Sequence, residues 1–134
     1  MTAAISSLEW AHVDLDQYPH IRVPPPGPRS RELHARCTKH FKGLSEQVKL
    51  FPVAFDSGRG CTLVDVDGNR YIDFSSGIYV TTLGHCHPKV TEAVQKYAGQ
   101  LMNAHDFTTK IKTLLCEKLA QVLPGDLTGY QFYD

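Results

Sequence analysis

The chain has 134 residues, a length within the range of a single domain. Leucine, isoleucine, valine and phenylalanine account for 34 of the 134 residues, about 25%, which exceeds the roughly 20% below which disorder is expected. Fourteen basic residues balance fourteen acidic ones, so no overall charge attracts nucleic acid or an anionic membrane. We therefore expect a folded chain with neither of these partners.

The cysteines and the first residues of the chain bear on its location. Cys37, Cys61, Cys86 and Cys116 lie far apart and include no C-x-x-C pair, a pattern that favours a reduced, cytoplasmic protein. Residues 1–8 lack the basic and apolar regions of a secretion signal, and no apolar run approaches the length of a membrane span. The sequence thus predicts neither export nor membrane insertion.

The chain begins with an arm, residues 1–28, that has no sustained hydrophobic periodicity and ends in a proline cluster at 24–28. Proline fixes φ and has no N–H group, so this cluster predicts a stiff spacer. Apolar residues then recur every three to four positions. That spacing predicts a helix over about 30–42, with Ser30 as its N-cap and Gly43 at its end.

The middle of the chain changes to the pattern of a β-sheet. Segments 61–65 and 71–74 are rich in β-forming residues and flank Asp-Gly-Asn at 67–69, a strong signal for a tight turn. These segments predict a hairpin. Residues 51–55 are expected to add a third antiparallel strand, and Ser-Ser-Gly at 75–77 to end the sheet.

Helical periodicity returns in the last third of the chain. One helix is expected from Pro88, and a second from residue 108 or 109 until Pro-Gly at 124–125 stops it. Residues 130–134 predict a strand with no partner after it, so the chain looks cut off there. The expected fold class is mixed α/β: a helix, a small antiparallel sheet, two amphipathic helices and the start of another sheet.

Two polar clusters resemble metal sites but lack required ligands. Residues 65–69 begin like a calcium loop, yet Arg70 replaces the glycine of the sixth position and Ser76 the glutamate of the twelfth. A hairpin turn accounts for them instead. His-Cys-His at 85–87 offers three potential ligands, whereas a structural zinc site needs four. We expect no bound metal, and His85 remains a candidate pocket residue.

Two further side chains are single candidates for a site. Asp134 is a lone carboxylate at the end of a predicted strand, where open α/β sheets place functional groups. Tyr79 lies among apolar neighbours after a glycine, and a core aromatic and a pocket wall are equally consistent with that position. The residues by themselves therefore indicate an α/β chain without an assembled active site.

Three segments of the chain have a distinctive order and spacing: G-C-T-L-V-D-V-D-G-N-R-Y-I-D-F at 60–74, S-G-I at 76–78 and L-G-H-C-H-P-K-V at 83–90. Together they closely resemble the N-terminal region of class III pyridoxal-phosphate aminotransferases. Residues 26–33 are similar to the lead-in helix of the branch that includes 4-aminobutyrate and acetylornithine aminotransferases. The resemblance covers about residues 24–134, and its specificity comes from the order and spacing of the segments, since no single motif suffices.

This resemblance implies a fold-type I enzyme that uses pyridoxal 5'-phosphate. Residues 29–105 would form a small-domain segment, and residues 106–134 would lead into the cofactor-binding large domain. The family's Schiff-base lysine and phosphate-binding turn would lie beyond residue 134, so no catalytic or cofactor-binding residue is assigned. The resemblance places Ile78, Tyr79 and Val80 in the wall of the substrate pocket, with Tyr79 as the leading candidate, and implies a homodimer in the full-length enzyme.

The implied activity is transfer of an amino group from an amine or omega-amino acid to a 2-oxo acid. The chain alone is expected to be inactive, because the lysine and the phosphate-binding turn are missing from it. A related decarboxylase, mutase or epimerase of the same fold is an alternative that the motifs do not separate. A non-catalytic interaction module and a small metal-binding protein centred on His85 and His87 are alternatives from other classes.

Overall fold

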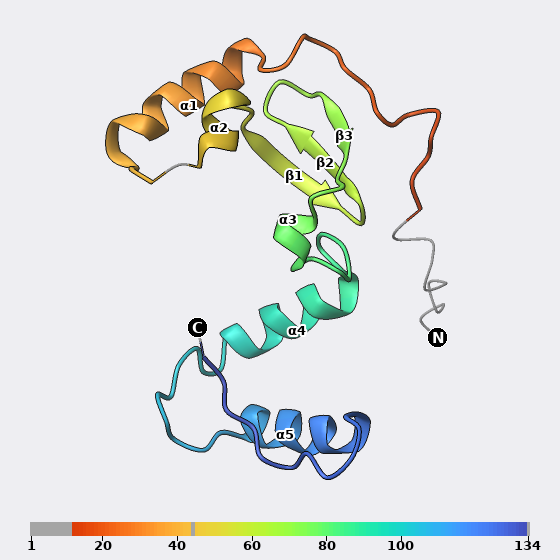
Figure 1. Ribbon diagram of the computed structural model, residues 1–134, viewed down its shortest axis with the longest axis vertical. Helices are drawn as coiled ribbons and strands as arrows, with labels where there is room; N and C mark the ends of the chain where they lie inside the picture. Colours follow the sequence, from red (N-terminus) through yellow and green to blue (C-terminus); the bar gives the residue numbers. More distant parts are fainter. Residues whose placement is uncertain (1–11, 44, 134) are drawn as a thin grey trace. The chain divides into compact units, whose positions relative to one another are not determined.

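The computed structural model describes residues 12–43 and 45–133 of an α/β chain. The chain divides into two compact units, the first reaching Glu92 and the second beginning at Ala93. The described residues form three strands and five helices, which Figure 1 labels in chain order. This is the mixed α/β class that the sequence predicts. None of the helices in the described part of the chain has the length and apolar character needed to span a membrane.

Helix α1 (Pro28–His40) starts at a proline, which suits the first turn because the N–H group that proline lacks has no partner there. The prediction of Ser30 as the N-cap is wrong: Gly27 occupies that position, and Ser30 is fully buried inside the helix. Gly27 has no side chain with which to cap the helix. The carboxylate of Asp67 supplies the cap from outside, accepting the backbone N–H groups of Arg29 and Ser30 at 2.9 and 2.8 Å.

A short helix and a three-stranded sheet follow. Helix α2 (Glu46–Leu50) was not predicted, since five residues are too few for periodicity to stand out. The strands are β1 (Phe55–Arg59), β2 (Thr62–Asp65) and β3 (Arg70–Ile72), antiparallel and in the order β1-β2-β3. The hairpin around residues 67–69 is confirmed. The third strand is antiparallel as predicted, but residues 51–55 were the wrong position for it.

The position of β1 has a physical cause. Its sequence, Phe-Asp-Ser-Gly-Arg, has weak β-propensity, and its strand conformation comes from pairing with β2, in which Gly58 lies opposite Leu63. Phe55 also packs edge-on against the Tyr71 ring of β3, with the ring centres 5.8 Å apart. The position of this strand is therefore set by its pairing with β2 and not by its own sequence.

Polar side chains form the buried centre of the first unit. Asp65 is almost fully buried, and its carboxylate accepts the side-chain amide of Asn69 at 2.8 Å and the hydroxyl of Tyr71 at 2.7 Å. Asn69, itself fully buried, accepts the backbone N–H groups of Arg22 and Val23 through its side-chain oxygen. The residues of the hairpin turn thus hold the end of the N-terminal arm against the sheet.

The last helices agree with the sequence pattern, and the last strand does not. Helix α4 (Pro88–Ala98) starts at the predicted proline. Helix α5 (Lys110–Val122) starts after Thr109, whose hydroxyl accepts the Lys112 N–H at 3.2 Å. The predicted strand at 130–134 is wrong for residues 130–133, which form no regular element because the described residues give it no neighbouring strand to pair with. Asp134 lies outside the described residues.

Candidate functional site

The segment after β3, where the resemblance predicts the pocket wall, folds into a left-handed turn. Ser76, Gly77, Ile78 and Tyr79 have φ values of 49°, 59°, 63° and 65°. They form the short element α3 (Ser76–Tyr79). A residue other than glycine pays roughly 1–2 kcal/mol for this conformation, and a β-branched residue such as Ile78 rarely adopts it. Such strain is held by surrounding structure and is concentrated at functional sites.

Hydrogen bonds to the Asp73 carboxylate and within the turn hold this conformation. One carboxylate oxygen of Asp73 accepts the N–H groups of Ser75 and Ser76 at 2.8 and 3.0 Å. The Ser76 carbonyl accepts the N–H groups of Val80 and Thr81 at 2.9 and 3.0 Å. The hydroxyl groups of Ser76 and Thr81 lie 3.0 Å apart. The turn is therefore closed by its own polar groups and anchored to the end of β3.

The other carboxylate oxygen of Asp73 contacts His85. The distance from Asp73 Oδ2 to His85 Nε2 is 2.7 Å, and the two side chains are 6% and 23% exposed. Burial raises the pKa of Asp73, but the hydrogen bonds from His85 and from the N–H groups of Ser76 and Ser75 outweigh it and lower the pKa below its usual value. Because the ionised carboxylate only accepts hydrogen bonds, Nε2–H of His85 is the donor.

The backbone of His85 is fixed as firmly as its side chain. Its N–H and C=O groups both pair with Gly60 at 2.9 Å, in an isolated β-bridge next to the sheet. The ring lies close to β1: a Cβ atom at Gly58 would come within 3.0 Å of the His85 ring. Glycine at that position therefore leaves room for the histidine. His85 thus contacts β1 at Gly58, the β1–β2 connection at Gly60 and the residue after β3, Asp73. The sequence analysis did not predict these contacts.

The three predicted pocket residues project from this anchored turn. Ile78, Tyr79 and Val80 are 80%, 80% and 77% exposed. Tyr79 is accordingly not a core aromatic in the described part of the chain, and its side chain is free to contact another molecule. Its assignment to a substrate pocket stays a prediction.

The His-Cys-His segment is spread over different environments. His85 faces Asp73, and Cys86 is exposed with a left-handed backbone, φ 53°. Among the described residues, no group of three or more histidine, cysteine, aspartate or glutamate side chains is placed to hold a metal ion. All four cysteines are present as free thiols.

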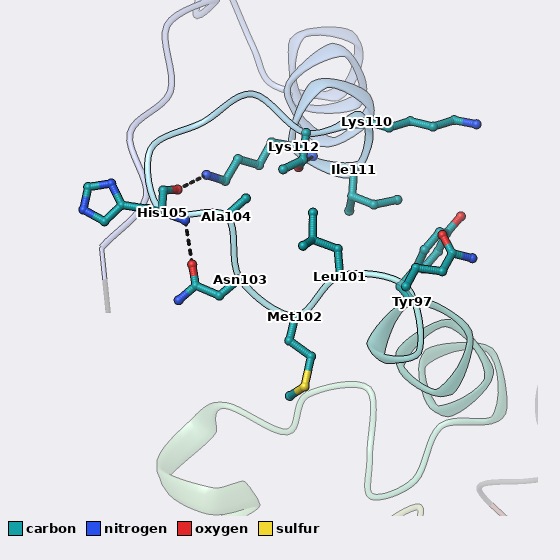
Figure 2. Close-up of a pocket in the computed structure, with 11 residues that line it drawn as sticks. Tyr97, Leu101, Met102, Asn103, Ala104, His105, Lys110, Ile111 and Lys112 are labelled. Atoms are coloured by element: carbon teal, nitrogen blue, oxygen red, sulfur yellow. Dashed lines mark hydrogen bonds between the residues drawn. The ribbon is translucent and has the colours of Figure 1, made fainter.

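The second unit contains a cleft that the sequence analysis missed. It has a volume of about 360 Å³ and lies between the end of α4 and the start of α5. Figure 2 shows Leu101 and Ile111 pointing toward the space between these helices, with Tyr97 on α4. Lys112 Nζ donates to the Phe107 carbonyl at 3.2 Å, and the His105 N–H donates to the Asn103 side chain at 2.7 Å. These polar groups order the connecting loop.

The described residues do not form a site for pyridoxal phosphate. The cofactor needs a lysine in an enclosed pocket and backbone N–H groups that cradle its phosphate. All eight lysines of the chain are exposed. The start of α1 is occupied by Asp67 and the start of α5 is capped by Thr109, so neither of these two helix ends stands open as a phosphate cradle. Because every lysine is exposed, these residues offer no enclosed amine to link to the cofactor.

Comparisons with known proteins connect this arrangement with one family. The sequence model described as "Aminotransferase class-III" matches residues 44–132. The chain is 37% identical over 114 residues to the alanine/serine racemase of Pyrococcus horikoshii, covering 84% of this chain and 24% of the racemase. It is 46% identical over 57 residues to the acetylornithine aminotransferase of Clostridium acetobutylicum, covering 42% of this chain and 15% of that enzyme.

Solved structures agree with the sequence comparisons. A transaminase from the marine bacterium Virgibacillus superposes with a TM-score of 0.64 and 27% identity, covering 73% of this chain and 24% of that one. The ornithine aminotransferase of Toxoplasma gondii gives 0.61 and 27%, covering 69% and 21%, and its active site was found partly occupied by pyridoxal phosphate, the cofactor of this family. The chain thus spans a quarter or less of the length of these relatives. It belongs to the class III aminotransferase family.

Proposed function

We propose that this chain is the N-terminal part of a pyridoxal-phosphate-dependent aminotransferase that moves an amino group from an amine or omega-amino acid to a 2-oxo acid. The observation that carries the proposal is the family match over residues 44–132. It is supported by relatives named acetylornithine and diaminobutyrate–2-oxoglutarate aminotransferase, whose names state an amino donor or an acceptor of these classes. The parts of the enzyme that bind the cofactor would come from outside these residues.

The contribution of this chain to the enzyme would be the shape of the substrate pocket. Ile78, Tyr79 and Val80 are exposed on a turn whose ends are anchored, so their side chains are available to contact an amino donor. An apolar and aromatic wall of this kind selects substrates by size and by apolar contact.

The full-length protein would have a small domain and a large domain, and this chain would contribute to both. Residues 29–105 would belong to the small domain, and residues 106–134 would lead into the large domain. The enzyme would be a homodimer, with active sites formed between subunits. A cytoplasmic location is supported by the four thiols, which form no disulfide within the chain.

A racemase is the second candidate. The alanine/serine racemase of Pyrococcus horikoshii aligns with 84% of this chain, more than the aligned share of the aminotransferases described above. Both activities are named among the proteins to which this chain is similar, and no described residue is assigned a part in either reaction.

The test is to assay the full-length protein, loaded with pyridoxal phosphate, against both reactions. Amino transfer is followed by oxo-acid consumption with acetylornithine, ornithine, diaminobutyrate and 4-aminobutyrate as donors, and racemisation by chiral chromatography of alanine and serine. We expect amino transfer, with the 134-residue chain as the inactive control. Racemisation without net amino transfer would replace the proposal by the second candidate, and failure to bind the cofactor would support a non-catalytic module.

A further inference from the structure

Both ends of the segment that carries the predicted pocket wall are fixed to the same short piece of chain. At its start, the Asp73 N–H donates to the Cys61 carbonyl at 2.8 Å. At its end, His85 exchanges two backbone hydrogen bonds with Gly60. The connection between β1 and β2 therefore anchors both residue 73 and residue 85. The residues between them form a loop that starts and ends at this connection.

The contact between the side chains of Asp73 and His85 joins the two ends of this loop directly. One oxygen of the carboxylate is occupied by two backbone N–H groups, those of Ser75 and Ser76, and the other faces His85 Nε2 at 2.7 Å. Asp73 is only 6% exposed, so water has little access to replace the histidine as a donor. Without that donor the carboxylate would be free to rotate away from the two serine N–H groups.

The left-handed turn begins at those two hydrogen bonds. Three of its four residues are not glycine, and each of them disfavours a positive φ. The N–H groups that Asp73 accepts belong to the residue before the turn and to its first residue. A rotation of the Asp73 carboxylate would therefore first break hydrogen bonds at the start of the left-handed segment.

We propose that Asp73 and His85 are a positioning pair that sets the left-handed turn at residues 76–79 and thereby directs Ile78, Tyr79 and Val80 toward the amino donor. The role in donor selection rests on the function proposed above, whereas the effect on the turn does not. Neither side chain is given a part in the chemistry. Their role is to fix the backbone conformation from which the side chains of residues 78–80 project.

Two amide side chains that differ by one methylene group provide a matched test. In His85→Gln, the side chain is long enough to place its N–H donor near the position of Nε2, so the contact with Asp73 is kept. In His85→Asn, the side chain is too short to reach Asp73. His40→Asn is the control, because His40 is exposed in the last turn of α1, away from the segment.

Two measurements on the full-length protein separate positioning from a general loss of stability. The first is amide hydrogen exchange across residues 74–84. We expect His85→Asn to exchange about tenfold faster there, as expected for the loss of a hydrogen bond to a charged group, and His85→Gln and His40→Asn to remain close to the parent protein. Equal exchange in His85→Asn and His85→Gln would overturn the proposed effect on the turn.

The second measurement is the ratio of kcat/KM between a bulky and a slender amino donor. We expect this ratio to change about tenfold in His85→Asn, mainly through KM, and to be restored in His85→Gln. A variant that loses melting temperature while keeping the parent ratio would show a merely structural role and overturn the proposal. If the parent protein has no transaminase activity, the proposed function fails, and the exchange measurement still decides the effect on the turn.

Discussion

Among single residues, Tyr79 has a left-handed backbone conformation and a side chain that is 80% exposed. Truncating a core aromatic costs about 3–5 kcal/mol, whereas substitutions of exposed side chains usually stay within about 0.5 kcal/mol. We therefore expect Tyr79→Ala in the full-length enzyme to keep a near-native melting temperature and to change the preference between bulky and slender donors. Phe41→Ala, which removes a 56% exposed ring after α1, is the control and should change neither. Strong destabilisation with unchanged donor preference would make Tyr79 structural.

Tyr71 gives a residue-scale prediction about pH. Burial and the hydrogen bond to Asp65 raise the pKa of Tyr71 to about 12, so folding favours its protonated form. The resulting stabilisation is fully present below pH 10, the ordinary tyrosine value, and is lost as pH rises toward 12. We expect ultraviolet titration to show one late phenol step that is absent in Tyr71→Phe and retained in Tyr133→Phe. A late step that persists in Tyr71→Phe would contradict the assignment.

At the scale of secondary structure, predictability followed the range of the interactions. The β2–β3 hairpin, α4 and α5 carry their signals within a few residues, and all three were predicted. The position of β1 depends on a neighbouring strand, and the cap of α1 comes from Asp67, which lies 38 residues after Arg29. At the candidate site, residues 78–80 come from the family resemblance and stay a prediction, whereas the contact between Asp73 and His85 requires the folded sheet.

The external cap of α1 gives a prediction at the same scale. A Cβ atom at Gly27 would overlap the Asp67 carboxyl group, so glycine is needed for Asp67 to reach the helix. Gly27→Ala and Asp67→Ala should each lower the melting temperature, and the glycine change should matter less once the carboxylate is gone. Gly129→Ala, where nothing lies within 4 Å of an added Cβ, is the neutral control. Additive losses in the double variant would show that the two positions are not coupled.

At the scale of the whole molecule, the described part of the chain has a hydrogen-bonded rather than a hydrophobic centre. Its largest fully buried side chain is Asn69, which donates to the Asp65 carboxylate and accepts the backbone N–H groups of Arg22 and Val23. The turn at residues 76–79 likewise has directional polar contacts at its start, where the Asp73 carboxylate meets the N–H groups of Ser75 and Ser76 and the His85 ring.

The last prediction concerns the 134-residue chain on its own. Its lysines are all exposed, and an exposed amine reacts with pyridoxal phosphate reversibly and without selection, because no pocket orients the aldehyde. After borohydride reduction and peptide mass spectrometry, we expect label spread over several lysines at well below one equivalent. Lys110 and Lys112, beside the cleft of the second unit, provide an internal check, since a cryptic site there would concentrate the label on them. Stoichiometric labelling of one lysine, together with amino transfer, would show that this chain forms a cofactor site by itself.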